Sequence, residues 1–322
     1  MTTWTLTMCL LMLSGTMWGQ AAPQAAQDAA ASDQPVTTLK VSTRMVAISA
    51  VVKSKGGAPQ GGMTADDFIL KQDGKVQPIH YFSQGSELPL TFAVMVDTSG
   101  SQRTFISDET LASDVFFETM LDAKNDRAML VQFDAAVTQL EGMTHSASDL
   151  RLALGRMDSR PATAGGTRLY DSIYAVAKGP MAKETGRKAM VILTDGGDNG
   201  STRTLAEAVE QAQRADVQIY AVVYSAWNDL TGVSGGHTPG EDAGRRVLEK
   251  MSQDTGGHVF TVSRTMSLRE IFAAIGEDLR LEYELGYTPP PDTQPNTYHK
   301  LELKAKDKKL AVQARDGFFA QP

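Results

Sequence analysis

Three oxygen-bearing side chains stand at alternate positions near residue 100. Asp97, Ser99 and Ser101 come directly after the apolar run 92–96, which has the character of a buried parallel strand. Ligands collect outside the carboxyl ends of such strands, so these side chains would point into a natural binding crevice. Mg²⁺ takes octahedral oxygen ligands at about 2.0–2.1 Å, and alternate residues of a tight loop can supply them. Taken alone, the segment equally fits a serine-rich turn that caps the next helix.

Two later segments place further oxygen atoms in the same setting. The apolar run 188–194 ends at Asp195, which is followed by two glycines. Between the two apolar runs, a glycine turn puts the hydroxyl of Thr167 just ahead of a segment with helical periodicity. The candidate ligands are therefore Asp97, Ser99, Ser101, Thr167 and Asp195.

In order and separation, these five residues resemble the metal-ion-dependent adhesion site of von Willebrand factor type A domains. The resemblance covers roughly residues 90–282, and the flanks are similar to those of secreted bacterial type A proteins found often in acidobacteria. It implies a divalent cation held by the five residues, Mg²⁺ in the first place, with Mn²⁺ or Ca²⁺ as alternatives. It also implies that an Asp or Glu carboxylate of a protein partner completes the coordination, because two carboxylates and three hydroxyls leave a position open.

Four further aspartates are interpreted as structural. Asp171 lies in the predicted helix after the glycine turn, and Asp198 lies in the turn after the second apolar run. Either could support the loops of a metal site, but ordinary helix and turn positions explain both. Asp66 and Asp67 follow Thr64 at the start of a short helical turn, where capping or solvated carboxylates are common.

An enzyme is the main rival class, because oxygen-ligated Mg²⁺ also serves phosphoryl transfer and hydrolysis. The chain has no Gly-x-x-x-x-Gly-Lys phosphate loop and no His-Glu-x-x-His sequence. Asp97 lacks a second aspartate two residues on, and the five histidines show no close pairing for zinc. We therefore expect an adhesion or protein-binding module and no enzyme. A structural or envelope-assembly protein with a vestigial metal site is the alternative, and a Mg²⁺-dependent hydrolase is a more remote one.

Charge excludes one large class of partners. The 322 residues include 31 Lys and Arg against 38 Asp and Glu, which gives a net charge of −7. Nucleic-acid binding needs a basic surface that displaces counterions from phosphates, so we expect no nucleic-acid partner. With 42% hydrophobic residues the chain can bury a core, and its length is typical of about two domains.

The N-terminus has most features of an export signal. Residues 4–18 form a short apolar stretch and small residues surround Ala21, so residues 1–21 are predicted to be a cleaved signal peptide. No Lys or Arg precedes the stretch, which leaves an uncleaved anchor or a misplaced start codon as alternatives. Because the stretch is short for a membrane span, we expect no stable span and a secreted or periplasmic protein. Cys9 is the single cysteine, so a cleaved chain would contain no disulfide.

The middle of the chain alternates strand and helix patterns. Residues 22–35 are small and polar and predict a disordered linker. Residues 90–282 then predict an α/β domain with a doubly wound, mostly parallel sheet. Strands are expected at 91–96, 127–133, 136–140, 188–194, 217–224 and 258–262, and helices near 106–122, 147–157, 169–179, 203–215, 242–255 and 267–282.

The two flanks of this domain have β character. Residues 36–89 and 283–320 contain short alternating segments separated by turn signals, including a hairpin at Asp73. We expect them to pack as one discontinuous β-sandwich-like module into which the α/β domain is inserted, because three strands rarely stand alone. Two unrelated β extensions are the alternative. The glycine-rich loop 225–240 fits a partner-contacting surface and a plain connection equally well.

Overall fold

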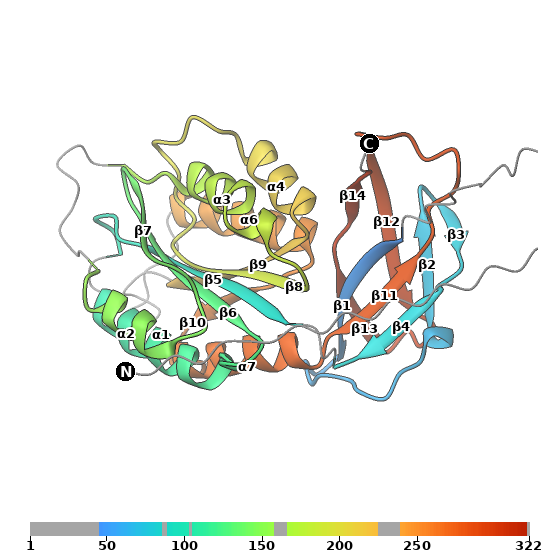
Figure 1. Ribbon diagram of the computed structural model, residues 1–322, viewed down its shortest axis with the longest axis horizontal. Coiled ribbons are helices and arrows are strands. Elements are labelled where there is room, and N and C mark those ends of the chain that lie inside the picture. Colours follow the sequence, from blue (N-terminus) through green and yellow to red (C-terminus); the bar gives the residue numbers. More distant parts are fainter. Residues whose placement is uncertain (1–44, 86–88, 103–104, 158–165, 225–238, 321–322) are drawn as a thin grey trace, which may run out of the picture. The chain divides into compact units, whose positions relative to one another are not determined.

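The computed structural model describes residues 45–85, 89–102, 105–157, 166–224 and 239–320 (Figure 1). The predicted signal peptide, the predicted linker and most of the loop 225–240 lie outside these residues. In the described part, a mixed α/β region is flanked in sequence by strands that form two further sheets. No helix within the described ranges is both long and apolar enough to cross a membrane.

The central sheet has six strands in the order β10-β9-β8-β5-β6-β7. Its strands are β5 (Leu90–Asp97), β6 (Arg127–Phe133), β7 (Val137–Thr144), β8 (Arg187–Leu193), β9 (Val217–Tyr224) and β10 (Val259–Val262). Neighbouring strands pair in parallel except for β7, which runs antiparallel to β6. The predicted doubly wound, mostly parallel sheet is therefore confirmed.

β5 is buried along its whole length. An uninterrupted apolar run suits a strand that is covered on both faces, and that is where β5 lies. Phe92, Val94 and Val96 belong to the core on one face, whereas Ala93 and Met95 belong to the core on the other, because successive side chains of a strand point to opposite faces. The strand therefore carries its polar end to the edge of a tightly packed sheet.

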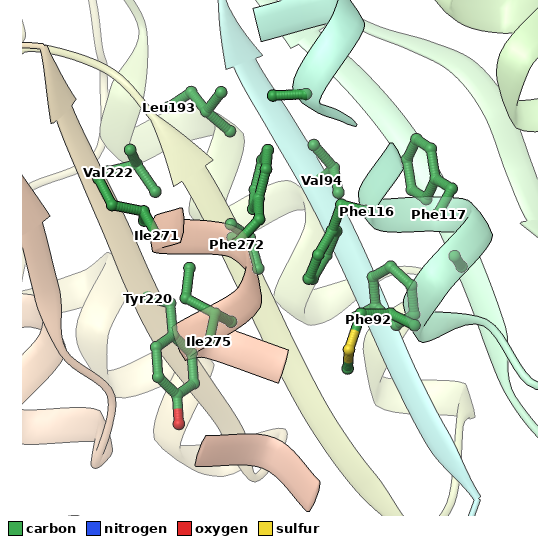
Figure 2. Packing of buried hydrophobic residues seen from close by; sticks show 14 of the residues in the cluster. Phe92, Val94, Phe116, Phe117, Leu193, Tyr220, Val222, Ile271, Phe272 and Ile275 are labelled. Carbon is green, nitrogen blue, oxygen red and sulfur yellow. The ribbon is translucent and has the colours of Figure 1, made fainter. Parts of the chain in front are cut away.

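Helices cover both faces of this sheet (Figure 1). They are α1 (Ile106–Met120), α2 (Ala147–Leu154), α3 (Leu169–Lys178), α4 (Leu205–Arg214), α6 (Pro239–Thr255) and α7 (Leu268–Arg280), with a short turn η2 (Met181–Lys183) after α3. α1, α2 and α7 pack on one face, and α3, α4 and α6 pack on the other. Figure 2 shows the first face, where the rings of Phe116 and Phe272 stack with centroids 4.5 Å apart and Phe92 meets Phe116 edge-on.

The starts of α4 and α7 are fixed by capping boxes. Thr204 precedes α4 and exchanges hydrogen bonds with Glu207, and Ser267 does the same with Glu270 ahead of α7. These pairs satisfy backbone N–H groups that a helix start leaves without partners. Each helix therefore begins one or two residues later than the periodicity alone suggested.

The flanks form two four-stranded sheets in the orders β13-β1-β11-β4 and β14-β12-β2-β3. Their strands are β1 (Val46–Ser54), β2 (Phe68–Gln72), β3 (Lys75–Gln77), β4 (Tyr81–Gln84), β11 (Tyr283–Tyr287), β12 (Tyr298–Ala305), β13 (Leu310–Ala314) and β14 (Gly317–Phe319). β1 pairs with β11 and β13, and β2 pairs with β12, so each sheet contains strands from both flanks. Gln84 of β4 lies opposite Tyr283 of β11, so the chain enters and leaves the α/β region through neighbouring strands.

Two turns of the N-terminal flank form where the sequence predicts them. The Asp67 carboxylate, at the end of η1 (Ala65–Asp67), accepts hydrogen bonds from the backbone N–H and the hydroxyl of Thr64. Asp73 and Gly74 connect β2 to β3 with φ angles of 49° and 81°, as an Asp-Gly hairpin requires. Asp67 is therefore a capping residue.

Candidate metal centre

Asp97 is the last residue of β5 and is fully buried. Beyond it the chain turns sharply, because the Ser99 N–H donates to Asp97 Oδ1 at 2.9 Å and the Gln102 N–H donates to Ser99 O at 3.0 Å. The hydroxyl oxygens of Ser99 and Ser101 lie 3.3 Å apart. One carboxylate and two hydroxyls are thus gathered in the loop at the carboxyl end of β5.

β8 delivers Asp195 to the same edge of the sheet, because β8 is the parallel neighbour of β5. The Thr194 hydroxyl donates to Asp97 Oδ2 at 2.7 Å, and Gln102 Nε2 donates to Asp195 Oδ2 at 3.1 Å. Two hydrogen bonds therefore join the loop after β5 to the loop after β8, and both end on candidate ligands.

The loop after β8 needs glycine at position 196, directly after Asp195. Gly196 has a φ of 82°, and a Cβ atom there would lie 2.5 Å from the carbonyl oxygen of Gly244 in α6. A side chain at this position would be strained and would also collide with backbone. The turn that presents Asp195 is thus set by close packing against α6.

Thr167 lies just ahead of α3 and is 7% exposed. Its N–H donates to Asn199 Oδ1 at 2.6 Å, and its carbonyl oxygen accepts from the N–H groups of Asn199 and Gly200, both at 3.1 Å. Asn199 belongs to the loop that begins at Asp195. These hydrogen bonds therefore connect the loop of Thr167 to the loop of Asp195.

Asp171 and Asp198 hold these loops together through hydrogen bonds of their own. The Asp171 carboxylate accepts from the N–H groups of Thr202 and Arg203 at 2.9–3.0 Å. Asp198 Oδ1 accepts from the Tyr170 N–H at 3.2 Å and from a nearby serine hydroxyl at 2.6 Å. Both aspartates are therefore structural in the described contacts, as their helix and turn positions indicate.

Two buried acids shape the electrostatics of this edge. Burial raises the pKa of Asp97 to about 6, although hydrogen bonds from Ser99 and Thr194 favour the ionised form and the charge of Asp195 opposes it. Glu109 on α1 is fully buried, and among the described residues neither of its carboxylate oxygens has a hydrogen-bond partner. Burial first, and then the charge of Asp97, raise the pKa of Glu109 well above its ordinary value.

The donor chemistry of the edge fits a hard divalent cation. Within the described ranges, no cluster of three or more His, Cys, Asp and Glu side chains is placed to hold a metal, so a cation here would depend on two carboxylates supplemented by hydroxyls. Carboxylate and hydroxyl oxygens are ligands for Mg²⁺, Mn²⁺ and Ca²⁺. A positive charge would also favour the ionised form of Asp97, which burial disfavours.

Three residues at this edge were not predicted from the sequence: Gln102, Thr194 and Glu109. Gln102 and Thr194 adjoin candidate ligands in the sequence, but their contacts depend on which strands are neighbours. Glu109 lies on the buried stripe of α1 together with Ile106 and Phe116. A charged residue within an apolar helical stripe is rare, and it was the signal that could have singled out Glu109.

One sequence pattern bears on the enzyme alternative. The letters Gly-x-Ser-x-Gly occur at 232–236, in the part of the loop 225–240 that lies outside the described residues. An activated serine of this kind stands on a sharp turn directly after a strand. β9, the last described strand before the pattern, ends at Tyr224.

A family model described as von Willebrand factor type A domain matches residues 93–274, more than half of the chain. The chain belongs to the von Willebrand factor type A family. The matched region of this type A domain runs from β5 into α7 and contains all five candidate ligands. The family predicted from the sequence is therefore confirmed.

Several solved structures resemble this chain at 14–15% sequence identity. BatB from Bacteroides thetaiotaomicron has a TM-score of 0.48 and 14% identity, over 59% of this chain and 97% of its own. A von Willebrand factor type A protein from Catenulispora acidiphila has a TM-score of 0.49 and 14% identity, over 79% and 74% of the two chains. Proximal thread matrix protein 1 from the mussel byssus, with a zinc-occupied MIDAS motif, has a TM-score of 0.46 and 15% identity, over 62% of this chain and 47% of its own. A search of curated proteins gives no match.

Proposed function

We propose that this protein is an exported adhesion module that captures a carboxylate of a protein partner through a divalent cation. The residues that would hold the cation are Asp97, Ser99, Ser101, Thr167 and Asp195. Mg²⁺ is the first candidate, and Mn²⁺ or Ca²⁺ would use the same oxygen set. The partner would supply an Asp or Glu side chain, and residues 1–21 would direct the chain to the periplasm or the exterior.

The observation that carries this proposal is the hydrogen-bonded meeting of two loops at one edge of the sheet. Asp97 and Asp195 come from different strands, and both are held by donors from the opposite loop. Two carboxylates at most offset the charge of a divalent cation, and hydroxyls add no charge. An external carboxylate would therefore bind by filling the coordination position that five side chains leave open, and the buried surroundings of Asp97 strengthen this short-range attraction.

The hydrogen bonding of the two acids favours binding over catalysis. Both oxygens of Asp97 accept hydrogen bonds, from the Ser99 N–H and the Thr194 hydroxyl. Both oxygens of Asp195 also accept, from the Gly197 N–H and from Gln102. Carboxylates held in this way are suited to orient around a cation, whereas a general base must be free to take a proton from substrate. We assign no catalytic residue.

Calorimetric titration with Mg²⁺, Mn²⁺ and Ca²⁺ tests the metal step. The wild-type protein should bind at least one of these ions, and Asp97→Ala should abolish binding. Thr297→Ala removes an exposed hydroxyl in the C-terminal flank and should bind like wild type. Absence of binding with all three ions would favour the alternative, a structural or envelope-assembly protein with a vestigial site.

Capture experiments test the partner step. The protein should retain a partner from the envelope fraction of the producing cell, and the chelator EDTA or the Ser99→Ala change should release it. Equal capture with and without EDTA would remove the metal from the mechanism. Turnover of phosphoesters or peptides that is abolished by Asp195→Ala would instead support a hydrolase.

A further inference from the structure

The two loops that carry the acidic ligands exchange hydrogen-bond donors. Thr194 precedes Asp195 on the loop after β8, yet its hydroxyl donates to Asp97 Oδ2 of the other loop at 2.7 Å. In return, Gln102 follows the serines of the first loop, and its Nε2 donates to Asp195 Oδ2 at 3.1 Å. Each acid is therefore held by a side chain from the loop of the other.

The remaining carboxylate oxygens are held locally. The Ser99 N–H donates to Asp97 Oδ1, and the Gly197 N–H donates to Asp195 Oδ1, both at 2.9 Å. These local bonds orient each acid within its own loop but do not relate one acid to the other. Beyond the pairing of β5 with β8, the two bonds that cross between the loops therefore help to fix the spacing between the two acids.

The crossing donors are neutral and buried. Thr194 is fully buried and Gln102 is 2% exposed. Since a carboxylate only accepts, the amide group of Gln102 must face Asp195 with its nitrogen, and its oxygen is left without a partner in the described contacts. Leaving a buried amide oxygen without a partner costs free energy, so a plain packing role would be served better by an apolar residue of the same size.

Uncharged hydrogen-bond donors also suit a cation site, because they do not repel the ion. A lysine or arginine in place of Gln102 would hold Asp195 equally well but would repel a divalent ion. A hydroxyl and an amide N–H each occupy one lone pair of an acid and leave the other lone pair for coordination. The pair thus aligns both carboxylates without changing the net charge at the edge of the sheet.

We propose that Gln102 and Thr194 are positioning residues of the metal site, which brace Asp97 and Asp195 against each other before a cation arrives. This inference rests on the proposed function, because it concerns the same site. Supporting residues of this kind typically change metal affinity by about 10–100-fold when they are replaced.

The test compares Gln102→Met and Thr194→Val with a matched control, Thr98→Val. Thr98 lies between Asp97 and Ser99 in the sequence and is fully buried, and in the described contacts its hydroxyl donates to a backbone oxygen, that of Phe133, at 3.5 Å. Calorimetry with Mn²⁺ should show about 10–100-fold weaker binding for Gln102→Met and Thr194→Val, and binding within about twofold of wild type for Thr98→Val. Melting temperatures in EDTA show whether each variant is folded.

A double-mutant cycle separates positioning from general destabilisation. If Gln102 acts through Asp195, then Gln102→Met should weaken Mn²⁺ binding no further in an Asp195→Asn background, even if it lowers the melting temperature. Additive losses would overturn the inference. So would unchanged Mn²⁺ affinity in Gln102→Met and Thr194→Val while wild type binds, an outcome that leaves the proposed function intact. Failure of wild type itself to bind Mg²⁺, Mn²⁺ or Ca²⁺ would overturn both.

Discussion

Asp97 and Glu109 are both buried carboxyl groups near the start of α1, but they differ in their partners. Asp97 accepts hydrogen bonds on both oxygens, so its ionised form is partly compensated. Glu109 accepts none from the part of the chain that the structure describes, so without a nearby cation its neutral form is strongly favoured. At the scale of residues, this difference in hydrogen bonding distinguishes Asp97, a candidate metal ligand, from Glu109, a buried acid that is not among the candidate ligands.

Glu109→Gln should flatten the pH dependence of stability in EDTA. Because the pKa of Glu109 is raised in the folded protein, its contribution is most favourable below the ordinary value of 4.5 and declines as the pH rises toward the folded pKa. In that window, wild type should lose up to about 1.4 kcal/mol per pH unit relative to the variant. Urea denaturation between pH 4 and 8 measures this difference, and Glu118→Gln, an exposed acid on the same helix, is the control. Parallel curves for wild type and Glu109→Gln would contradict the assignment.

His299 in the flanking sheets should respond to pH in a defined direction. Its Nδ1 lies 2.8 Å from Asp73 Oδ2 and its Nε2 lies 3.0 Å from Gln294 O, so both ring nitrogens face acceptors. Burial favours the neutral ring, but these hydrogen bonds and the charge of Asp73 outweigh burial and raise the pKa of His299. The stabilisation is then complete below the ordinary value of 6.5 and is lost as the pH rises through the folded pKa.

His299→Gln should therefore cost about 1 kcal/mol of unfolding free energy at pH 6, a figure that allows for the partial exposure of Asp73. The cost should be smaller at pH 9, further above the ordinary value of 6.5, because less of the ring is then charged. Denaturant unfolding at the two pH values measures the difference. An equal cost at both would show that the ring is not charged in the folded protein.

The candidate ligands form a recognisable pattern in the sequence, whereas the residues that support them do not. Asp97, Ser99 and Ser101 lie within five residues, so their chemistry is visible as a short motif. The bond from Gln102 to Asp195 spans 93 positions and exists only because β8 lies next to β5. Such contacts depend on the order of strands in the sheet, which a local pattern does not contain.

At the scale of elements, hydrophobic runs predict buried strands well and the exposed edge strand β7 poorly. β5 and β8 are apolar and buried, and they lie where the sequence predicts them. β7 was predicted at 136–140 but spans Val137–Thr144. The reason is that none of its residues is fully buried, so its second half has no apolar run that could mark it as a strand.

Two glycines with nearly the same φ angle allow a matched test of the loop after β8. Gly196 and Gly57 have φ angles of 82° and 83°, but only Gly196 would bring a Cβ against backbone, that of Gly244. Gly57→Ala should cost about 1–2 kcal/mol from its conformation alone. Gly196→Ala should cost about 1–3 kcal/mol more and should weaken Mn²⁺ binding. Denaturation and calorimetry measure both, and equal costs would mean that the loop does not pack on α6 in this way.

At the scale of the whole molecule, the decisive feature is how distant segments meet. Pairing of β4 with β11 brings together the two points where the chain enters and leaves the α/β region. The sequence predicted that the two flanks pack together, because three strands rarely stand alone. The register of these strands could not be predicted from alternation alone. The domain boundaries at 36–89, 90–282 and 283–320 stay predictions.

The central claim concerns the same scale, because it holds that three separate stretches of chain share one cation. Anomalous diffraction from crystals soaked in MnCl₂ tests it most directly. We expect one strong peak at the carboxyl ends of β5 and β8, coordinated directly or through water by Asp97, Ser99, Ser101, Thr167 and Asp195, and absent in Asp97→Ala. No peak at that edge, or a peak without Thr167 and Asp195 around it, would show that the three stretches do not share a cation.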